Sequence, residues 1–226
     1  MEHSLLQHNI QTIFQQVGQA APGRTVTIVA ATKTRTPEEI QAAREYGIRA
    51  AGENRVQEFC EKLPLGAYDG LSRHFIGHLQ TNKVAKIVGQ VELIESVDSL
   101  RLLQAIDERA AKLNIRQDIL AEINIGAEAA KSGMPPAQLD AFLENAAKRT
   151  HIRVLGLMTV APKAENDIVC QYFTQMYKLF IDKRRYTCDN IKMEYLSMGM
   201  SGDYLLALAC GANMIRVGTG IFGPRI

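Results

Sequence analysis

The fold is decided by one stretch near the amino terminus, Val26-Thr27-Ile28-Val29-Ala30-Ala31-Thr32-Lys33-Thr34. Its continuous run of apolar and β-branched residues predicts a buried strand. That strand ends on a lysine, just before the polar loop Thr34-Arg35-Thr36-Pro37. In α/β barrels the carboxyl ends of the strands carry the chemistry, and a partly desolvated lysine there can lose its proton and attack a carbonyl carbon. Lys33 is therefore the leading candidate for a functional residue.

The pattern of a short apolar run followed by a helical segment repeats along the sequence. Eight strands are expected, at residues 26–32, 48–52, 74–77, 91–97, 118–125, 152–160, 193–197 and 214–217. Helical spacing predicts helices at residues 37–46, 56–63, 81–88, 100–113, 135–149, 167–182 and 204–210. This alternation favours a single (β/α)8 TIM-type barrel domain over residues 1–226, with an extra amino-terminal helix over residues 2–19. A doubly wound open sheet is the alternative, but no Gly-x-Gly-x-x-Gly follows the first strand.

The composition excludes several classes of function. The chain has 226 residues, of which 46% are hydrophobic and 22% charged, and its net charge of +2 does not indicate a nucleic-acid-binding protein. No apolar stretch approaches the roughly 20 residues of a membrane span, and the amino terminus lacks a signal-peptide pattern. The four cysteines have no Cys-x-x-Cys spacing, which favours a reducing compartment over disulfides or a metal site. A cytoplasmic protein without metal, membrane or nucleic-acid partners is expected.

The loops after the last two predicted strands are rich in small and hydroxyl residues. They read Ser197-Met198-Gly199-Met200-Ser201-Gly202-Asp203 and Gly218-Thr219-Gly220. TIM barrels frequently bind phosphate at these two loops, where accessible backbone N–H groups and hydroxyls can surround the anion. Ordinary turn glycines and helix-capping serines are the alternative for either loop alone. A lysine amine and a phosphate site in one barrel together predict a pyridoxal 5′-phosphate (PLP) site.

Arg216 ends the eighth predicted strand and so faces the same site. Arginine stays protonated in proteins, so its guanidinium can donate a hydrogen bond to the pyridine nitrogen of PLP and keep that nitrogen unprotonated. A contact with phosphate or carboxylate is the alternative. Other polar residues at this end have ordinary interpretations: Glu53 and Asp203 as helix caps, and Lys83 and Lys131 as exposed loop lysines whose further roles stay open.

Several longer motifs resemble one protein family through nearly the whole chain. The chain is similar to the pyridoxal phosphate homeostasis proteins, whose fold is related to the barrel of alanine racemase. The matching motifs are Ala31-Thr32-Lys33-Thr34, Gly52-Glu53-Asn54-Arg55-Val56-Gln57-Glu58, His74-Phe75-Ile76-Gly77-His78-Leu79-Gln80-Thr81-Asn82-Lys83, Lys131-Ser132-Gly133, Gly156-Leu157-Met158-Thr159, Leu196-Ser197-Met198-Gly199-Met200-Ser201-Gly202-Asp203 and Arg216-Val217-Gly218-Thr219-Gly220-Ile221-Phe222-Gly223-Pro224-Arg225. The chain departs from the usual pattern of this family at two places, Arg35-Thr36 and Arg73. Both lie outside the residues expected to bind the cofactor.

The resemblance implies a role for each candidate residue. Lys33 is the Schiff-base lysine, Asn54 lies near the cofactor ring, and Arg216 is at the pyridine nitrogen. Ser197, Gly218 and Thr219 surround the phosphate. The implied function is intracellular PLP homeostasis without efficient catalysis. The expected partners are PLP, with other B6 vitamers and PLP-requiring apo-enzymes as further candidates.

Two enzymatic alternatives remain. A PLP-dependent amino-acid racemase or decarboxylase would need an acid–base partner, yet the sequence stops at Ile226 without the β-domain of alanine racemases, and Tyr204 lies inside a predicted helix. The same feature favours a monomer. A cofactor-free aldolase-type barrel would be expected to place its lysine on the sixth strand, where Met158-Thr159 stands. No catalytic residue is therefore assigned.

Overall fold

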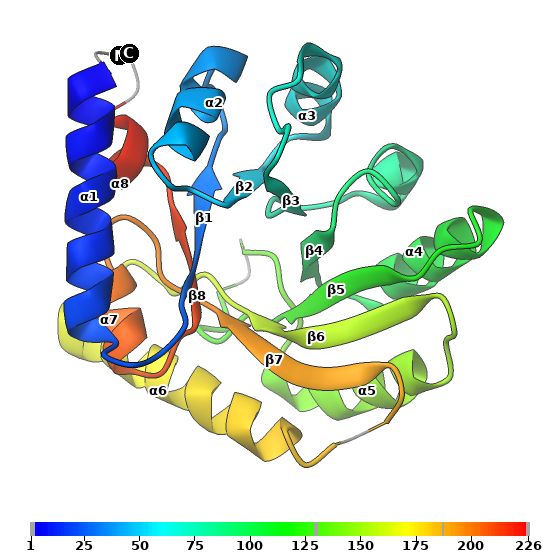
Figure 1. Ribbon diagram of the computed structural model, residues 1–226. Coiled ribbons are helices and arrows are strands. Elements are labelled where there is room, and N and C mark those ends of the chain that lie inside the picture. Colours follow the sequence, from blue (N-terminus) through cyan, green and yellow to red (C-terminus); the bar gives the residue numbers. More distant parts are fainter. Residues whose placement is uncertain (1–2, 129–130, 187, 225–226) are drawn as a thin grey trace.

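The computed structural model of the protein describes residues 3–128, 131–186 and 188–224. At its centre is a closed barrel of eight parallel strands that pair in chain order, with β1 also pairing with β8 (Figure 1). The strands are β1 (Thr27–Ala31), β2 (Ala50–Glu53), β3 (Ser72–Phe75), β4 (Leu93–Val97), β5 (Gln117–Glu122), β6 (Ile152–Met158), β7 (Ile191–Ser197) and β8 (Met214–Val217). The predicted barrel fold is confirmed.

Helices connect the strands and surround the barrel (Figure 1). The α-helices are α1 (His3–Ala20), α2 (Pro37–Glu45), α3 (Val56–Lys62), α4 (Leu100–Lys112), α5 (Leu139–Ala147), α6 (Asn166–Lys183), α7 (Tyr204–Ala209) and α8 (Thr219–Phe222). The 3₁₀ helices are η1 (Leu63–Leu65), η2 (Thr81–Lys86) and η3 (Pro136–Gln138). Among the described residues, no helix combines the length and apolar character that a bilayer crossing requires.

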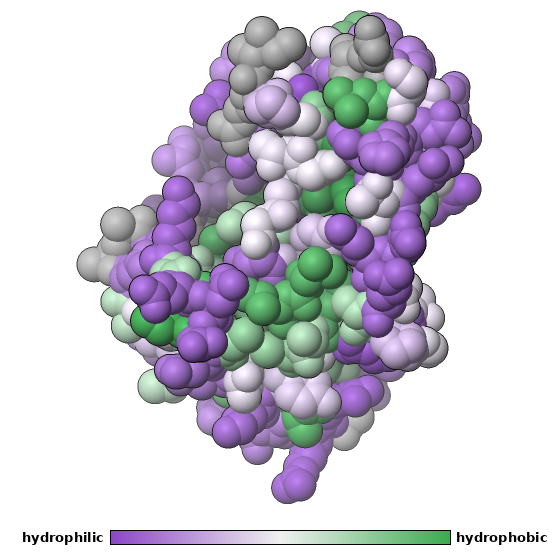
Figure 2. Space-filling model, turned by 90° about the vertical axis from the view of Figure 1, so that its left-hand side faces the viewer, coloured by the Kyte–Doolittle hydropathy of each residue, from purple (hydrophilic) through white to green (hydrophobic). Residues whose placement is uncertain are grey.

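The extra helix α1 lies along the outside of the barrel, beside α8 (Figure 1). Ile10, Ile13 and Val17 are buried, as the helical spacing predicts, and Leu6 is buried with them. Leu5 and Phe14, which belong to the predicted apolar spacing, are exposed instead. Figure 2 views this side of the molecule and shows hydrophobic side chains gathered near the middle of the face, with hydrophilic ones around them. The predicted amino-terminal helix is thus present, apart from Glu2, which lies outside the described residues.

Apolar side chains pack inside the barrel and separate its two ends. Because both faces of each strand are covered, the strands read as continuous apolar runs. Interior members of this packing are Val29, Ala50, Ile76, Leu93, Leu120, Leu155, Met158 and Met214. Glu95 of β4 and Arg216 of β8 are also buried, so the barrel encloses opposite charges. All eight strands run in one direction, so their carboxyl ends meet at one mouth of the barrel.

The structure corrects several predicted elements. Residues 81–88, predicted to be helical, form a 3₁₀ helix, η2, which ends earlier, at Lys86. The helix predicted over residues 135–149 is divided into the 3₁₀ turn η3, which Pro136 begins, and the α-helix α5. Thr219 and Gly220, predicted as loop, begin the single-turn helix α8.

Candidate functional site

A cavity of about 240 Å³ opens at the mouth formed by the carboxyl ends of the strands. Five of the six predicted site residues line it: Lys33, Asn54, Arg216, Gly218 and Thr219. They come from segments up to 186 residues apart in the sequence, the separation between Lys33 and Thr219. The structure thus brings together four residues selected from strand ends and the loops after them, and Asn54, which the family resemblance implied.

Further residues complete the cavity wall. Ile76 and Val160 supply apolar surface, and the loop after β7 contributes Met200, Ser201 and Gly202. Ser201 had two interpretations in the sequence, phosphate contact or helix cap. Its hydroxyl accepts hydrogen bonds from the N–H groups of Gly218 and Gly220, both at 3.1 Å. Two backbone donors therefore converge on a single oxygen atom, which is an arrangement suited to a phosphate oxygen.

Lys33 lies on a tight turn directly after β1. The N–H of Arg35 donates to the carbonyl of Thr32 at 3.0 Å and closes the turn. Thr34 has φ of 63°, a left-handed conformation that is unfavourable for a β-branched residue. Thr32 is buried, whereas Lys33 is only partly buried and lines the cavity. The local backbone therefore presents the lysine at the end of a rigid strand.

Arg216 is held in the barrel by buried polar partners. Its guanidinium donates to the carbonyl of Thr159 at 2.8 Å and to the Ser197 hydroxyl at 2.5 Å. The Ser197 hydroxyl in turn donates to Glu95 at 2.5 Å, and the Glu95 carboxylate lies 3.8 Å from Arg216. Burial lowers the pKa of Arg216, although nearby carboxylates oppose this effect. The guanidinium is thus fixed in orientation and paired with a carboxylate.

Glu95 also contacts the imidazole of His74, at 2.7 Å. Burial works against ionisation of Glu95, but the hydrogen bond and charge of His74, with Arg216 and Ser197, outweigh burial and hold the pKa of Glu95 below its ordinary value. His74 therefore has a structural partner. Among the described residues, no group of three or more His, Cys, Asp or Glu is arranged to hold a metal ion.

Ser197 lies deeper than Gly218 and Thr219, the other residues predicted to bind phosphate. It is fully buried beneath the cavity, where its hydroxyl bridges Glu95 and Arg216. A direct contact of Ser197 with phosphate stays a prediction. The observed contacts place it behind the guanidinium instead.

Glu122 of β5 is a second buried carboxyl in the barrel. Burial raises its pKa to about 7, with a smaller contribution from Asp98 in the same direction and an opposing one from Arg216. Its Oε2 atom has no hydrogen-bond partner in the described part of the chain. Glu122 therefore keeps its proton to a higher pH in the folded protein than an exposed carboxyl does.

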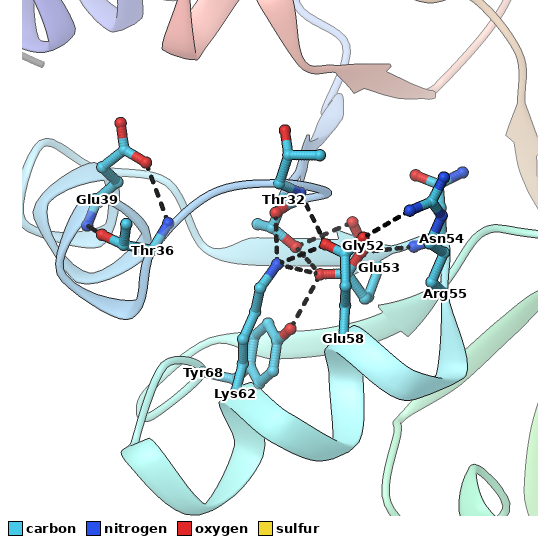
Figure 3. A network of polar contacts seen from close by, with 11 residues as sticks. Thr32, Thr36, Glu39, Gly52, Glu53, Asn54, Arg55, Glu58, Lys62 and Tyr68 are labelled. Atoms are coloured by element: carbon cyan, nitrogen blue, oxygen red, sulfur yellow. Dashed lines mark hydrogen bonds and ion pairs between the residues drawn. The ribbon is translucent and has the colours of Figure 1, made fainter. Parts of the chain in front are cut away.

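A cluster of ionic side chains lies beside Thr32, the residue before Lys33 (Figure 3). The ammonium of Lys62 on α3 is 2.8 Å from Glu53 and 3.1 Å from Glu58. Glu53 also accepts hydrogen bonds from the side chains of Thr32 and Tyr68, both at 3.2 Å. The expectation that Glu53 simply caps the following helix is wrong, because its carboxylate is fully buried within this cluster. Burial and the charge of Glu53 raise the pKa of Tyr68.

Asn54, directly after β2, has a buried side-chain oxygen, Oδ1, without a partner among the described residues. Because an unpaired buried polar atom is costly, it marks a place where a ligand can bind. Asn54 also borders a neighbouring groove that Lys83 lines. Lys131 is engaged elsewhere, with the carbonyl of Ala161 at 3.0 Å and with Glu128 at 3.1 Å.

Comparison with known proteins gives consistent matches over nearly the full chain. The family model of the alanine racemase N-terminal domain matches residues 3–225. The pyridoxal phosphate homeostasis protein of Aquifex aeolicus is 42% identical over 199 residues, covering 88% of this chain and 86% of its own. The protein of the same name from Escherichia coli K12 is 36% identical over 231 residues, covering 96% of each chain.

Solved structures agree with these matches. PipY of Synechococcus elongatus, determined with PLP bound, has 30% identity and a TM-score of 0.85, covering 96% of this chain and 100% of PipY. An alanine racemase from Clostridium difficile has a TM-score of 0.76 at 16% identity, covering 96% of this chain and 60% of the racemase, and so shares the fold. The chain therefore belongs to the alanine racemase N-terminal domain family, and within it to the pyridoxal phosphate homeostasis proteins.

Proposed function

We propose that this protein binds PLP reversibly in the cavity at the carboxyl ends of the strands and serves intracellular PLP homeostasis. One observation carries the proposal: Lys33, Asn54, Arg216, Gly218 and Thr219 line a single cavity. The names of the relatives and the PLP-bound PipY structure support the choice of ligand. An amine, a ring-nitrogen donor and a phosphate cradle are the three groups that PLP requires.

The residues present fit this cofactor. Asn54, whose Oδ1 is buried without a partner among the described residues, lines the cavity, and the N–H groups of Gly218 and Gly220 converge on one oxygen, that of the Ser201 hydroxyl. When bound, PLP supplies an aldehyde that condenses with an amine to a C=N bond with loss of water. Lys33 is the amine proposed for this attachment, since it lines the cavity from the end of β1.

Arg216 is proposed to donate a hydrogen bond to the pyridine nitrogen. Its guanidinium remains a donor at neutral pH, so the ring nitrogen is kept as an acceptor rather than protonated. Ser197 and Glu95 hold the guanidinium in place from below. An unprotonated ring withdraws electrons less strongly, which restrains reactions at carbon atoms attached to the cofactor.

We infer that efficient catalysis is not part of this function. Among the described residues that line the cavity, Lys33 and Arg216 are the only ionisable side chains. Tyr204 donates its hydroxyl proton to Gln16 of α1 and does not line the cavity. Since proton transfer at a substrate carbon needs a positioned acid or base, turnover at about 1 s⁻¹ or faster in racemisation or decarboxylation assays would contradict this inference.

The wider setting follows from the same proposal. Free PLP is the principal partner, and other B6 vitamers and PLP-requiring apo-enzymes are candidates for exchange. A monomer in the cytoplasm stays the predicted state. Sedimentation and cell fractionation test these two predictions directly.

Absorption spectroscopy with purified protein tests the proposed function. Addition of PLP is expected to produce a visible band distinct from that of the free cofactor. Lys33→Ala should abolish the band while leaving the circular dichroism spectrum unchanged, whereas the matched control Lys83→Ala should retain it. A wild-type protein that takes up no PLP would overturn the proposal, and a band that survives in Lys33→Ala would move the attachment to another lysine.

A further inference from the structure

We propose that Glu58 and Lys62 are positioning residues that hold the Lys33 turn in register with Asn54. The inference rests on the proposed PLP attachment to Lys33. Neither residue lines the cofactor cavity, and both belong to α3, which follows β2. They contact the two segments that carry Lys33 and Asn54, through the backbone of Thr32 and Thr34 and through the Glu53 carboxylate (Figure 3).

Lys62 is a buried lysine whose ammonium has three partners. Its Nζ atom donates to the carbonyl of Thr32 at 2.9 Å, to Glu53 at 2.8 Å and to Glu58 at 3.1 Å. An ammonium group has three N–H donors, so these contacts use its full capacity. Thr32 directly precedes Lys33, and Glu53 directly precedes Asn54. One charge thus binds the ends of both β1 and β2.

Glu58 holds the other side of the turn. Its Oε2 accepts a hydrogen bond from the N–H of Thr34 at 2.7 Å, in addition to the bond from Lys62. Thr34 has the left-handed φ of 63°, which costs on the order of 1–3 kcal/mol for a non-glycine residue. The contacts that hold Thr34 in this unfavourable backbone conformation also determine the direction of the neighbouring Lys33 side chain. The turn is therefore fixed at both residues that flank Lys33.

Asn54 belongs to the same framework. Its backbone N–H donates to Glu53 Oε1 at 2.9 Å, while Glu53 Oε2 accepts from Lys62. The amine of Lys33 and the amide of Asn54 are therefore positioned by opposite sides of one ion-paired cluster. Loss of one member should displace the amine relative to the cavity without removing any group that contacts the cofactor.

Loss of Glu58 or Lys62 should affect the attachment of PLP to Lys33. The Lys33 nitrogen forms a bond to the aldehyde carbon, and the carbonyl oxygen leaves as water, so no oxidant or reductant is needed. A misplaced nucleophile slows such a step strongly. Phosphate binding by the loops after β7 and β8 should be unaffected, because Glu58 and Lys62 lie on the opposite side of Lys33.

Glu58→Ala tests the inference with little risk to folding, since the Glu58 side chain is partly exposed and the buried Lys62–Glu53 pair remains. The rate at which the visible band grows after mixing with PLP should fall about tenfold, equivalent to about 1.4 kcal/mol. The affinity for pyridoxine 5′-phosphate, which lacks the aldehyde, should stay within about twofold of wild type. Glu58→Gln keeps an acceptor for Thr34 and should restore most of the rate.

Glu61→Ala is the matched control, because it removes the same charge from an exposed position on the same helix. It should leave the attachment rate unchanged. Thr34→Gly in the Glu58→Ala background should recover part of the rate, since glycine accepts a positive φ without cost. An unchanged rate in Glu58→Ala, or equal loss of affinity for pyridoxine 5′-phosphate, would overturn the positioning role. Absence of any band in the wild type would instead contradict the proposed function.

Discussion

Replacement of Glu95 by glutamine is a sharp test of the charge arrangement inside the barrel. The substitution keeps the size of the side chain but removes the carboxylate that lies 3.8 Å from Arg216. Glu95 is fully buried, and its oxygens contact His74 at 2.7 Å and Ser197 at 2.5 Å. Glu95→Gln therefore leaves a buried guanidinium without its counter-charge.

The expected loss of stability is large for a domain of this kind. Breaking a buried ion pair from one side costs about 3–5 kcal/mol, against a total unfolding free energy of about 5–15 kcal/mol for typical proteins. The direction in which this contribution to stability changes with pH is also fixed. Because the pKa of Glu95 is lowered in the folded protein, its stabilising contribution is present above the unfolded pKa of about 4.3 and is lost as the pH falls through the lower folded value.

Urea unfolding of wild type and Glu95→Gln measures this difference. At pH 7 the free energy of unfolding should fall by about 3–5 kcal/mol, and the gap should narrow below about pH 4. Combining Glu95→Gln with Arg216→Met should cost less than the sum of the two single variants, because the double variant leaves no unpaired charge. A change below about 1 kcal/mol at pH 7, or strict additivity, would refute this account of the interior.

Other predictions concern the remaining buried groups and the close approach of β2 and β3. Because burial raises the pKa of Glu122 to about 7, the folded state binds this proton more tightly and wild-type stability should fall from about pH 4.5 to pH 7. Glu122→Gln should remove that fall and be more stable than wild type at pH 8, by up to about 3 kcal/mol, as urea midpoints at pH 5 and pH 8 would show. Gly77→Ala should lower both Tm and PLP affinity, since an added Cβ would lie 2.0 Å from the Asn54 carbonyl oxygen. As a control, the Cβ added by Gly18→Ala on α1 meets no atom within 4 Å. In thermal unfolding Gly18→Ala should be neutral or stabilising by less than about 1 kcal/mol. Lys62→Met should destabilise by about 3–5 kcal/mol at pH 7, measured by the same urea unfolding, because it leaves Glu53 buried without its cation.

The barrel could be predicted because eight short apolar runs alternate with helical segments, and the carboxyl ends of parallel strands in such a barrel meet at one mouth. Lys33 and Arg216 could be selected for the same reason, whereas Asn54 was assigned through the family resemblance. The position of Ser197 could not be predicted from the sequence. How deep Ser197 lies in the barrel depends on how β7 pairs with β8, where Ser197 lies opposite Met214. A strand-end serine can face a loop or the interior, and only the barrel register decides between them.

The ionic cluster of Lys62, Glu53 and Glu58 could not be predicted from the sequence either. Lys62 ends a short helix, where an exposed lysine beside the helix carboxyl terminus is the usual case. Its burial depends on how α3 docks against the turn at Thr32, a contact between residues 30 positions apart.

Trapping of the attached cofactor tests the central claim most directly. Borohydride reduction of the PLP-loaded protein, followed by peptide mapping and mass spectrometry, should place the cofactor mass on Lys33, with bleaching of the visible band. Retention of the mass on Lys83, Lys131 or any other lysine, with Lys33 unmodified, would contradict the account.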